Sequence, residues 1–265
     1  MGTETFYDQD YWRNGKHAGM EMPASMFRRV MAPLIARETV LDYGCGFGHS
    51  YQRQLVGAVK RYVGADVSSM AIENARHKGL EVVPVDPVNG TVPLPSSTFD
   101  GAVCSEVFEH LFDPLSAARE IYRVLKPGGV LIATVPNFGY HTWRLLAFLR
   151  AQVPLEPEDP KRDRYRGVHI RFFSKLILKR LLRDAGFVNI KIGSFDNASV
   201  WDVFMAMGHF GRITSFAHRH FPAFLHHRFL QDVWPNVFAL RLRAVAWKPT
   251  TTEAEKSARN VQDQA

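Results

Sequence analysis

The sequence predicts an α/β protein built on a mostly parallel, doubly wound sheet. Two observations carry this prediction: short apolar runs alternate with helical stretches between residues 39 and 137, and several of these runs end in an acidic residue. Alternating strands and helices imply a parallel sheet with helices on both faces. Ligands of such sheets bind beyond the carboxyl ends of the strands, so acidic strand ends predict one shared site.

A glycine cluster follows the first predicted strand. This strand, at about residues 39–42, ends in Asp42 and runs into a loop that holds Gly44 and Gly46. A short apolar run, a glycine turn and a following helix form a recognisable strand–turn–helix unit. Because glycine has no Cβ, its backbone can approach a ligand closely. The cluster therefore predicts a loop that shapes the site of a nucleotide-derived cofactor.

Three further predicted strands end in polar residues. The ends are Asp66 followed by Val67 for the run 62–67, Asp86 for the run 82–86, and Ser105 with Glu106 for the run 99–106. Since the carboxyl ends of parallel strands meet at one edge of a sheet, we expect these residues around a single ligand.

The remaining elements follow from capping and turn residues. Ser68 or Ser69 caps one helix and Ser174 caps another, which Gly186 ends, and Lys-Pro-Gly-Gly from residue 126 stops a third. The predicted helices span residues 50–57, 69–78, 115–125, 140–150 and 174–184, and the later strands span residues 130–135, 188–194 and 237–247.

The ordered motifs resemble the class I S-adenosylmethionine (SAM)-dependent methyltransferases, and most of all the branch with quinone-biosynthesis and glycan methyltransferases. The motifs span residues 39–137, with a looser match to about 193. The resemblance implies a Rossmann-like, seven-stranded sheet with an antiparallel last strand, SAM as cofactor and S-adenosylhomocysteine as product. It also implies roles for the strand ends. Asp42, Gly44 and Gly46 would hold the methionine end of SAM. Asp66, beside Val67, would bind the ribose, and Asp86 would accept a hydrogen bond from the adenine amino group. Ser105 and Glu106 would pass beneath the cofactor.

The chain divides into four predicted parts. Residues 1–38 form a helical lid, residues 39–248 form the methyltransferase domain, and residues 249–265 form a disordered tail. Two stretches interrupt the domain pattern, one rich in proline and charge and one rich in aromatic residues and histidine. We expect helical cap insertions there, at residues 138–168 and 196–236.

Histidines near the strand ends are the candidate catalytic bases. A hydroxyl acceptor benefits from a base that titrates near neutral pH, which favours His110 and His169, with His141 behind them. Each of these residues also has a structural interpretation as a helix cap, a packed ring or a loop residue. Arg171 either binds an anionic group of the acceptor or forms a surface salt bridge. The sequence therefore favours O-methylation of a small-molecule, lipid-linked or glycan hydroxyl.

Composition limits the partners. The net charge of +7 and the aromatic cap fit peripheral contact with an anionic membrane, although the aromatic residues can equally form the cap's own core. No nucleic-acid motif, signal peptide or spanning apolar run is recognisable, so we expect a cytoplasmic protein, either monomer or homodimer. Neither the two cysteines nor the histidines between residues 209 and 227 match a metal-ligand pattern, so no metal is predicted.

Two other functions stay open. Some proteins of this fold have lost catalysis and act as binding or assembly proteins. An acidic residue about twenty positions after the glycines also fits an NAD-dependent oxidoreductase, but His49 stands where that fingerprint needs its third glycine. The sequence does not identify the acceptor.

Overall fold

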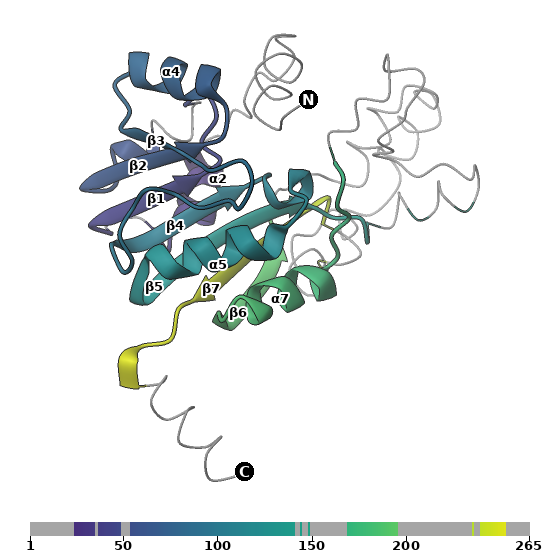
Figure 1. The fold of residues 1–265 in the computed structure, drawn as a ribbon. Helices are drawn as coiled ribbons and strands as arrows, with labels where there is room; N and C mark the ends of the chain where they lie inside the picture. Colours follow the sequence, from purple (N-terminus) through teal and green to yellow (C-terminus); the bar gives the residue numbers. More distant parts are fainter. Residues whose placement is uncertain are drawn as a thin grey trace, which may run out of the picture.

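A single mixed sheet forms the centre of the molecule (Figure 1). The computed structural model describes residues 24–34, 37–48, 54–140, 144, 148, 169–195, 235 and 239–252. Within this part of the chain the sheet has seven strands in the order β3-β2-β1-β4-β5-β7-β6. The strands are β1 (Thr39–Tyr43), β2 (Arg61–Asp66), β3 (Val82–Pro84), β4 (Phe99–Ser105), β5 (Leu125–Pro136), β6 (Val188–Ser194) and β7 (Arg241–Trp247).

The pairing confirms the predicted sheet. β1 pairs in parallel with β2 on one side and with β4 on the other, and only β7 runs antiparallel to its neighbours β5 and β6. The chain order therefore reverses between β1 and β4. In doubly wound sheets a ligand binds beyond the carboxyl ends of the strands at this point.

Side-chain alternation explains why helices cover both faces. Successive residues of a strand point to opposite faces. In β1, Leu41 and Tyr43 join the core cluster that includes residues of α5 (Pro114–Val124) and α7 (Lys175–Asp184), whereas Val40 joins the cluster that includes residues of α2 (Ala24–Met31). The helices are α2 (Ala24–Met31), α4 (Ser69–His77), the short 3₁₀ helix η2 (Phe108–His110), α5 (Pro114–Val124) and α7 (Lys175–Asp184).

The predicted helix caps are confirmed at α4 and α7. The Ser68 side chain accepts a hydrogen bond from the Ala71 amide, and the Ser174 side chain accepts one from the Ile177 amide. Gly186 follows α7 with a φ of 102°, a conformation that favours glycine.

The clearest difference from the expected elements lies at the start of β5. The Lys-Pro-Gly-Gly segment was predicted to be a helix stop before a strand at 130–135, but α5 ends at Val124 and β5 begins at Leu125. Leu125 pairs with Phe99, and the Gly128 amide and the Gly129 carbonyl both bond the backbone of Lys248. These partners lie far away in the chain, so the local glycine and proline signal could not reveal them.

Two other strands are shorter than expected. β3 ends at Pro84, two residues before Asp86, and β7 begins at Arg241 instead of residue 237. Several predicted parts lie outside the described residues: much of the lid, most of both cap insertions, most of the tail, and His141. Of the helix predicted at 50–57, residues 54–57 are described; residues 54–56 are helical and residue 57 is in a turn. No described helix is long and apolar enough to cross a bilayer.

Candidate functional site

Asp66 ties the glycine loop to the end of β2. One carboxylate oxygen accepts a hydrogen bond of 2.8 Å from the Gly46 amide, and the other accepts one of 3.0 Å from the Ser68 amide. The Asp66 side chain is buried, with 7% exposure. A carboxylate has about four lone-pair sites, so these two bonds do not by themselves exhaust its capacity to accept ribose hydroxyls.

The loop after β1 has no room for a side chain at Gly44. Its φ is +82°, and a Cβ built there would lie 2.3 Å from Cγ2 of Val107. The amides of Gly44 and Cys45 both donate to the Ala65 carbonyl, which fixes the loop against β2. Gly46 also has a positive φ, of 55°. The loop is therefore a tight, close-fitting backbone turn, at the place where the resemblance leads us to expect the methionine end of SAM.

Asp42 is fully buried beneath this loop. Its carboxylate accepts a hydrogen bond of 2.7 Å from the Tyr62 hydroxyl in the neighbouring strand. A buried carboxylate needs such donors to offset its lost hydration. The structure therefore gives Asp42 a part in holding β1 against β2, beside the ligand role that the resemblance implies.

Asp86 and Val67 line one pocket beyond the ends of β2 and β3. The pocket has a volume of about 460 Å³, and its other lining residues include Ser69, Ile72 and Pro84. Asp86 is exposed and accepts hydrogen bonds from the amides of Val88 and Asn89, so it also caps a turn. Its place at this pocket fits the predicted adenine contact.

Ser105 and Glu106 are linked through a residue that the sequence analysis did not single out. Thr134, fully buried in β5, shares a hydrogen bond of 2.8 Å with the Ser105 hydroxyl and donates one of 3.0 Å to the Glu106 carboxylate. Glu106 has a φ of 56°, unusual for a residue with a side chain. A threonine inside an apolar strand was the available sequence signal.

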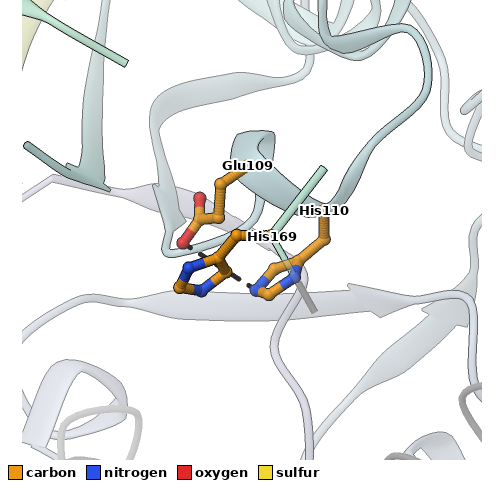
Figure 2. Close-up of side chains that lie close together, drawn as sticks. All are labelled: Glu109, His110 and His169. Atoms are coloured by element: carbon orange, nitrogen blue, oxygen red, sulfur yellow. Dashed lines mark ion pairs between the residues drawn. The ribbon is translucent and has the colours of Figure 1, made fainter. Parts of the chain in front are cut away.

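His110 and His169 lie side by side, although 59 positions separate them in the sequence. Their ring centroids are 4.9 Å apart, and Figure 2 shows Glu109 beside both rings. The distance from Nε2 of His110 to Oε1 of Glu109 is 3.8 Å. The structure therefore brings the two predicted bases together and adds a carboxyl group that the prediction had missed.

Backbone hydrogen bonds hold this cluster. The Glu109 carbonyl accepts from the amides of Ile170 and Arg171, which places His169 against the η2 turn. The Arg171 guanidinium donates to the backbone carbonyls of Leu111 and Phe112. Arg171 thus ties together the segments that carry His110 and His169, a role that neither of its two predicted interpretations included.

Burial shifts the protonation of the cluster. The Glu109 side chain is 1% exposed, and burial together with the nearby Glu106 raises the pKa of its carboxyl group well above the usual range. Burial lowers the pKa of His169, which favours the neutral imidazole. A neutral imidazole at neutral pH can accept a proton, as a general base must.

Comparison with known proteins gives a family match. A family model described as a methyltransferase domain matches residues 16–192. "Probable S-adenosylmethionine-dependent methyltransferase Rv3030" of Mycobacterium tuberculosis is 31% identical over 163 residues, which is 60% of this chain and 52% of the relative. A demethylmenaquinone methyltransferase of Corynebacterium kroppenstedtii is 29% identical over 161 residues, 58% of this chain and 69% of the relative. The chain thus spans about half the length of its mycobacterial relative.

Solved structures share the fold. A SAM-dependent methyltransferase from Archaeoglobus fulgidus superposes with a TM-score of 0.52 at 20% identity, over 84% of this chain and 92% of the other. Phosphoethanolamine N-methyltransferase 2 of Haemonchus contortus, in complex with SAM, superposes with a TM-score of 0.59 at 16% identity, over 94% of this chain and 60% of the other.

Proposed function

The chain belongs to the SAM-dependent methyltransferase family, and from that premise we propose that it methylates a hydroxyl group of a small-molecule, lipid-linked or glycan acceptor. SAM, when bound, supplies a methyl group already activated on a sulfonium centre. Alignment of the acceptor with that methyl group therefore contributes much of the rate. The loop with Gly44 and Gly46, Asp66 and the pocket lined by Val67 and Asp86 are the residues that would hold the cofactor.

The paired imidazoles support a hydroxyl acceptor. A hydroxyl must lose its proton as it becomes methylated. His110 lies in η2, the turn that follows β4, and the His169 ring lies beside it. The lowered pKa of His169 supports a neutral ring that is ready to accept this proton. This pairing is the single observation that favours oxygen methylation over transfer to an amine that already has a free electron pair.

Methyl-labelled SAM tests this function. The purified protein is incubated with labelled SAM and a host extract, which is then divided into organic, aqueous and macromolecular fractions. We expect label in one fraction, with an organic product favouring a lipid or quinone-like acceptor and an aqueous or macromolecular product favouring a soluble metabolite or a glycan. Label in no fraction, while SAM still binds, would contradict the enzyme function and favour a binding protein.

A matched set of histidine variants tests the base. His110→Gln and His169→Gln are expected to lower the transfer rate about 10²-fold or more, the usual contribution of a general base, while SAM still binds. His77→Gln serves as the control because His77 is exposed on α4, beside Glu73. Equal transfer by all three variants would show that the imidazoles are not the base, even if the methyltransferase function stands.

Exposed apolar residues support peripheral contact with an anionic bilayer. Phe112, which follows the cluster, is 77% exposed, and Leu176 and Ile177 in the first turn of α7 are 75% and 50% exposed. The same helix carries four exposed basic residues, which are Lys175, Lys179, Arg180 and Arg183. Apolar and basic groups together suit an anionic interface. Such contact would bring the site to a lipid-linked acceptor.

Liposome pelleting tests this contact. At low salt the protein is expected to pellet with phosphatidylglycerol vesicles, and Leu176→Ser with Ile177→Ser to reduce the pelleted fraction. Val88→Ser is the control because Val88 is 92% exposed elsewhere, in the turn after β3. No pelleting of the wild type, or equal loss in the control, would contradict the proposal.

A further inference from the structure

Glu109 places a carboxyl group in the interior of the protein. Among the residues that the structure describes, neither of its two buried carboxyl oxygens has a hydrogen-bond partner. Burying a polar group without a partner destabilises a folded protein. A fold that only needed to fill this space would be more stable with an apolar side chain, so the position of Glu109 beside two imidazoles calls for a chemical explanation.

The three side chains converge on a small space. One carboxyl oxygen of Glu109 and one ring nitrogen from each of His110 and His169 all lie within 4.8 Å of one another. Figure 2 shows the carboxyl group and both rings converging on one space. The 3.8 Å between Oε1 of Glu109 and Nε2 of His110 is longer than a hydrogen bond, so sharing a proton requires the two side chains to move closer together.

We propose that Glu109, His110 and His169 form one proton-sharing unit, in which Glu109 is the positioning residue for the imidazole that accepts the acceptor's proton. This inference rests on the proposed function and deepens it. In the form that acts as the base, the ring nitrogen that faces Glu109 carries the N–H and donates it to the Glu109 carboxylate, which fixes the tautomer of that ring and leaves the lone pair on the outward nitrogen. When the acceptor hydroxyl releases its proton, this lone pair takes it up as a new N–H bond, and the inward proton passes to the Glu109 carboxylate, so that the ring stays neutral.

The charges around Glu109 support a shared proton. Glu106, just beyond β4, disfavours a negative charge on the Glu109 carboxyl group, whereas Arg241, at the start of β7, favours that charge. The thiol of Cys104 in β4 also lies within the field of Glu109, which helps to raise the pKa of this cysteine. These charges act on the same carboxyl group that lies beside the two rings, and ionisable groups that interact in this way titrate as a unit.

Nuclear magnetic resonance of histidine-labelled protein tests the unit without an acceptor. The ring signals of His110 and His169 are assigned with the His110→Gln and His169→Gln variants and followed against pH in the full chain. We expect two inflections in at least one of these rings in the wild type, and a single inflection after Glu109→Gln, which keeps the shape but cannot share a proton. Glu120→Gln is the matched control, because Glu120 is also buried but bonds Arg123 and the Val92 amide.

Two results would overturn the proposal. One is a single inflection in both rings that Glu109→Gln leaves unchanged. The other is a divalent metal that copurifies at one equivalent per chain and is lost in Glu109→Gln, because the ring nitrogens would then bind an ion instead of a proton. Circular dichroism and calorimetry with SAM verify that the variants fold. Since neither readout needs methyl transfer, failure of the proton-sharing unit is distinguishable from failure of the proposed function.

Discussion

Substituting Gly44 with alanine separates backbone strain from steric exclusion in the glycine loop. Gly44 and Gly79 share a φ of +82°, but a Cβ at Gly79 meets nothing within 4 Å, whereas a Cβ at Gly44 would lie 2.3 Å from Val107. Each alanine costs about 1–2 kcal/mol for the left-handed backbone. Gly44→Ala adds overpacking, typically about 1–3 kcal/mol. The difference in free energy of unfolding between the two variants is therefore expected to be about 1–3 kcal/mol.

Urea denaturation followed by circular dichroism measures this difference, and calorimetry measures SAM affinity. Gly44→Ala is expected to weaken SAM binding at least about tenfold, or about 1.4 kcal/mol, because the loop must shift away from Val107. Gly79→Ala is expected to leave SAM affinity unchanged, because Gly79 lies after the C-cap of α4. Equal stability losses together with unchanged SAM affinity in both variants would refute the reasoning.

Three further predictions have defined outcomes, and the first has a control substitution. Asp66→Asn leaves one backbone amide without its acceptor, so it is expected to lower the free energy of unfolding by about 1–3 kcal/mol in urea denaturation and to weaken SAM binding in calorimetry. Asp100→Asn is the control: it loses the ion pair with Lys126 and is expected to lower stability without changing SAM binding. Tyr62→Phe removes the donor to buried Asp42 and is expected to cost about 1–3 kcal/mol by the same assay. Because the pKa of Glu109 is raised in the folded chain, the folded chain keeps a proton that the unfolded chain releases near pH 4.5. The stability of the wild type therefore falls as pH rises from about 4.5 toward the raised pKa of the folded state. Glu109→Gln is therefore expected to gain Tm relative to the wild type as pH rises from about 5 to about 8, and a constant difference would contradict this.

The strand ends were predictable because their signals are local. The short apolar runs that end in Asp42 and Asp66 became β1 and β2, paired in parallel as expected. The Ser68 cap of α4 and the Ser174 cap of α7 were predictable for the same reason, since a side chain bonds an amide only three residues away.

The rest depends on contacts between distant parts of the chain. The start of β5 at Leu125 requires β4 and the backbone of Lys248. The cluster around Glu109 requires Ile170 and Arg171, whose amides bond its carbonyl from 61 and 62 positions away. A histidine next to a glutamate is common in sequences, and only the tertiary structure brings His169 to the same place. The proximity of the cluster was therefore beyond sequence reasoning, although two of its three members were predicted.

Calorimetry of the purified chain with SAM, S-adenosylhomocysteine and NAD tests the central claim most directly. We expect one SAM site per chain, which also binds S-adenosylhomocysteine, and no heat of binding with NAD. The affinity for SAM is expected to fall in Asp66→Asn, because this variant weakens the hydrogen bond that anchors the Gly46 amide. Binding of NAD in place of SAM, or SAM binding that Asp66→Asn leaves unchanged, would contradict the assignment of the cofactor site to the ends of β1 and β2.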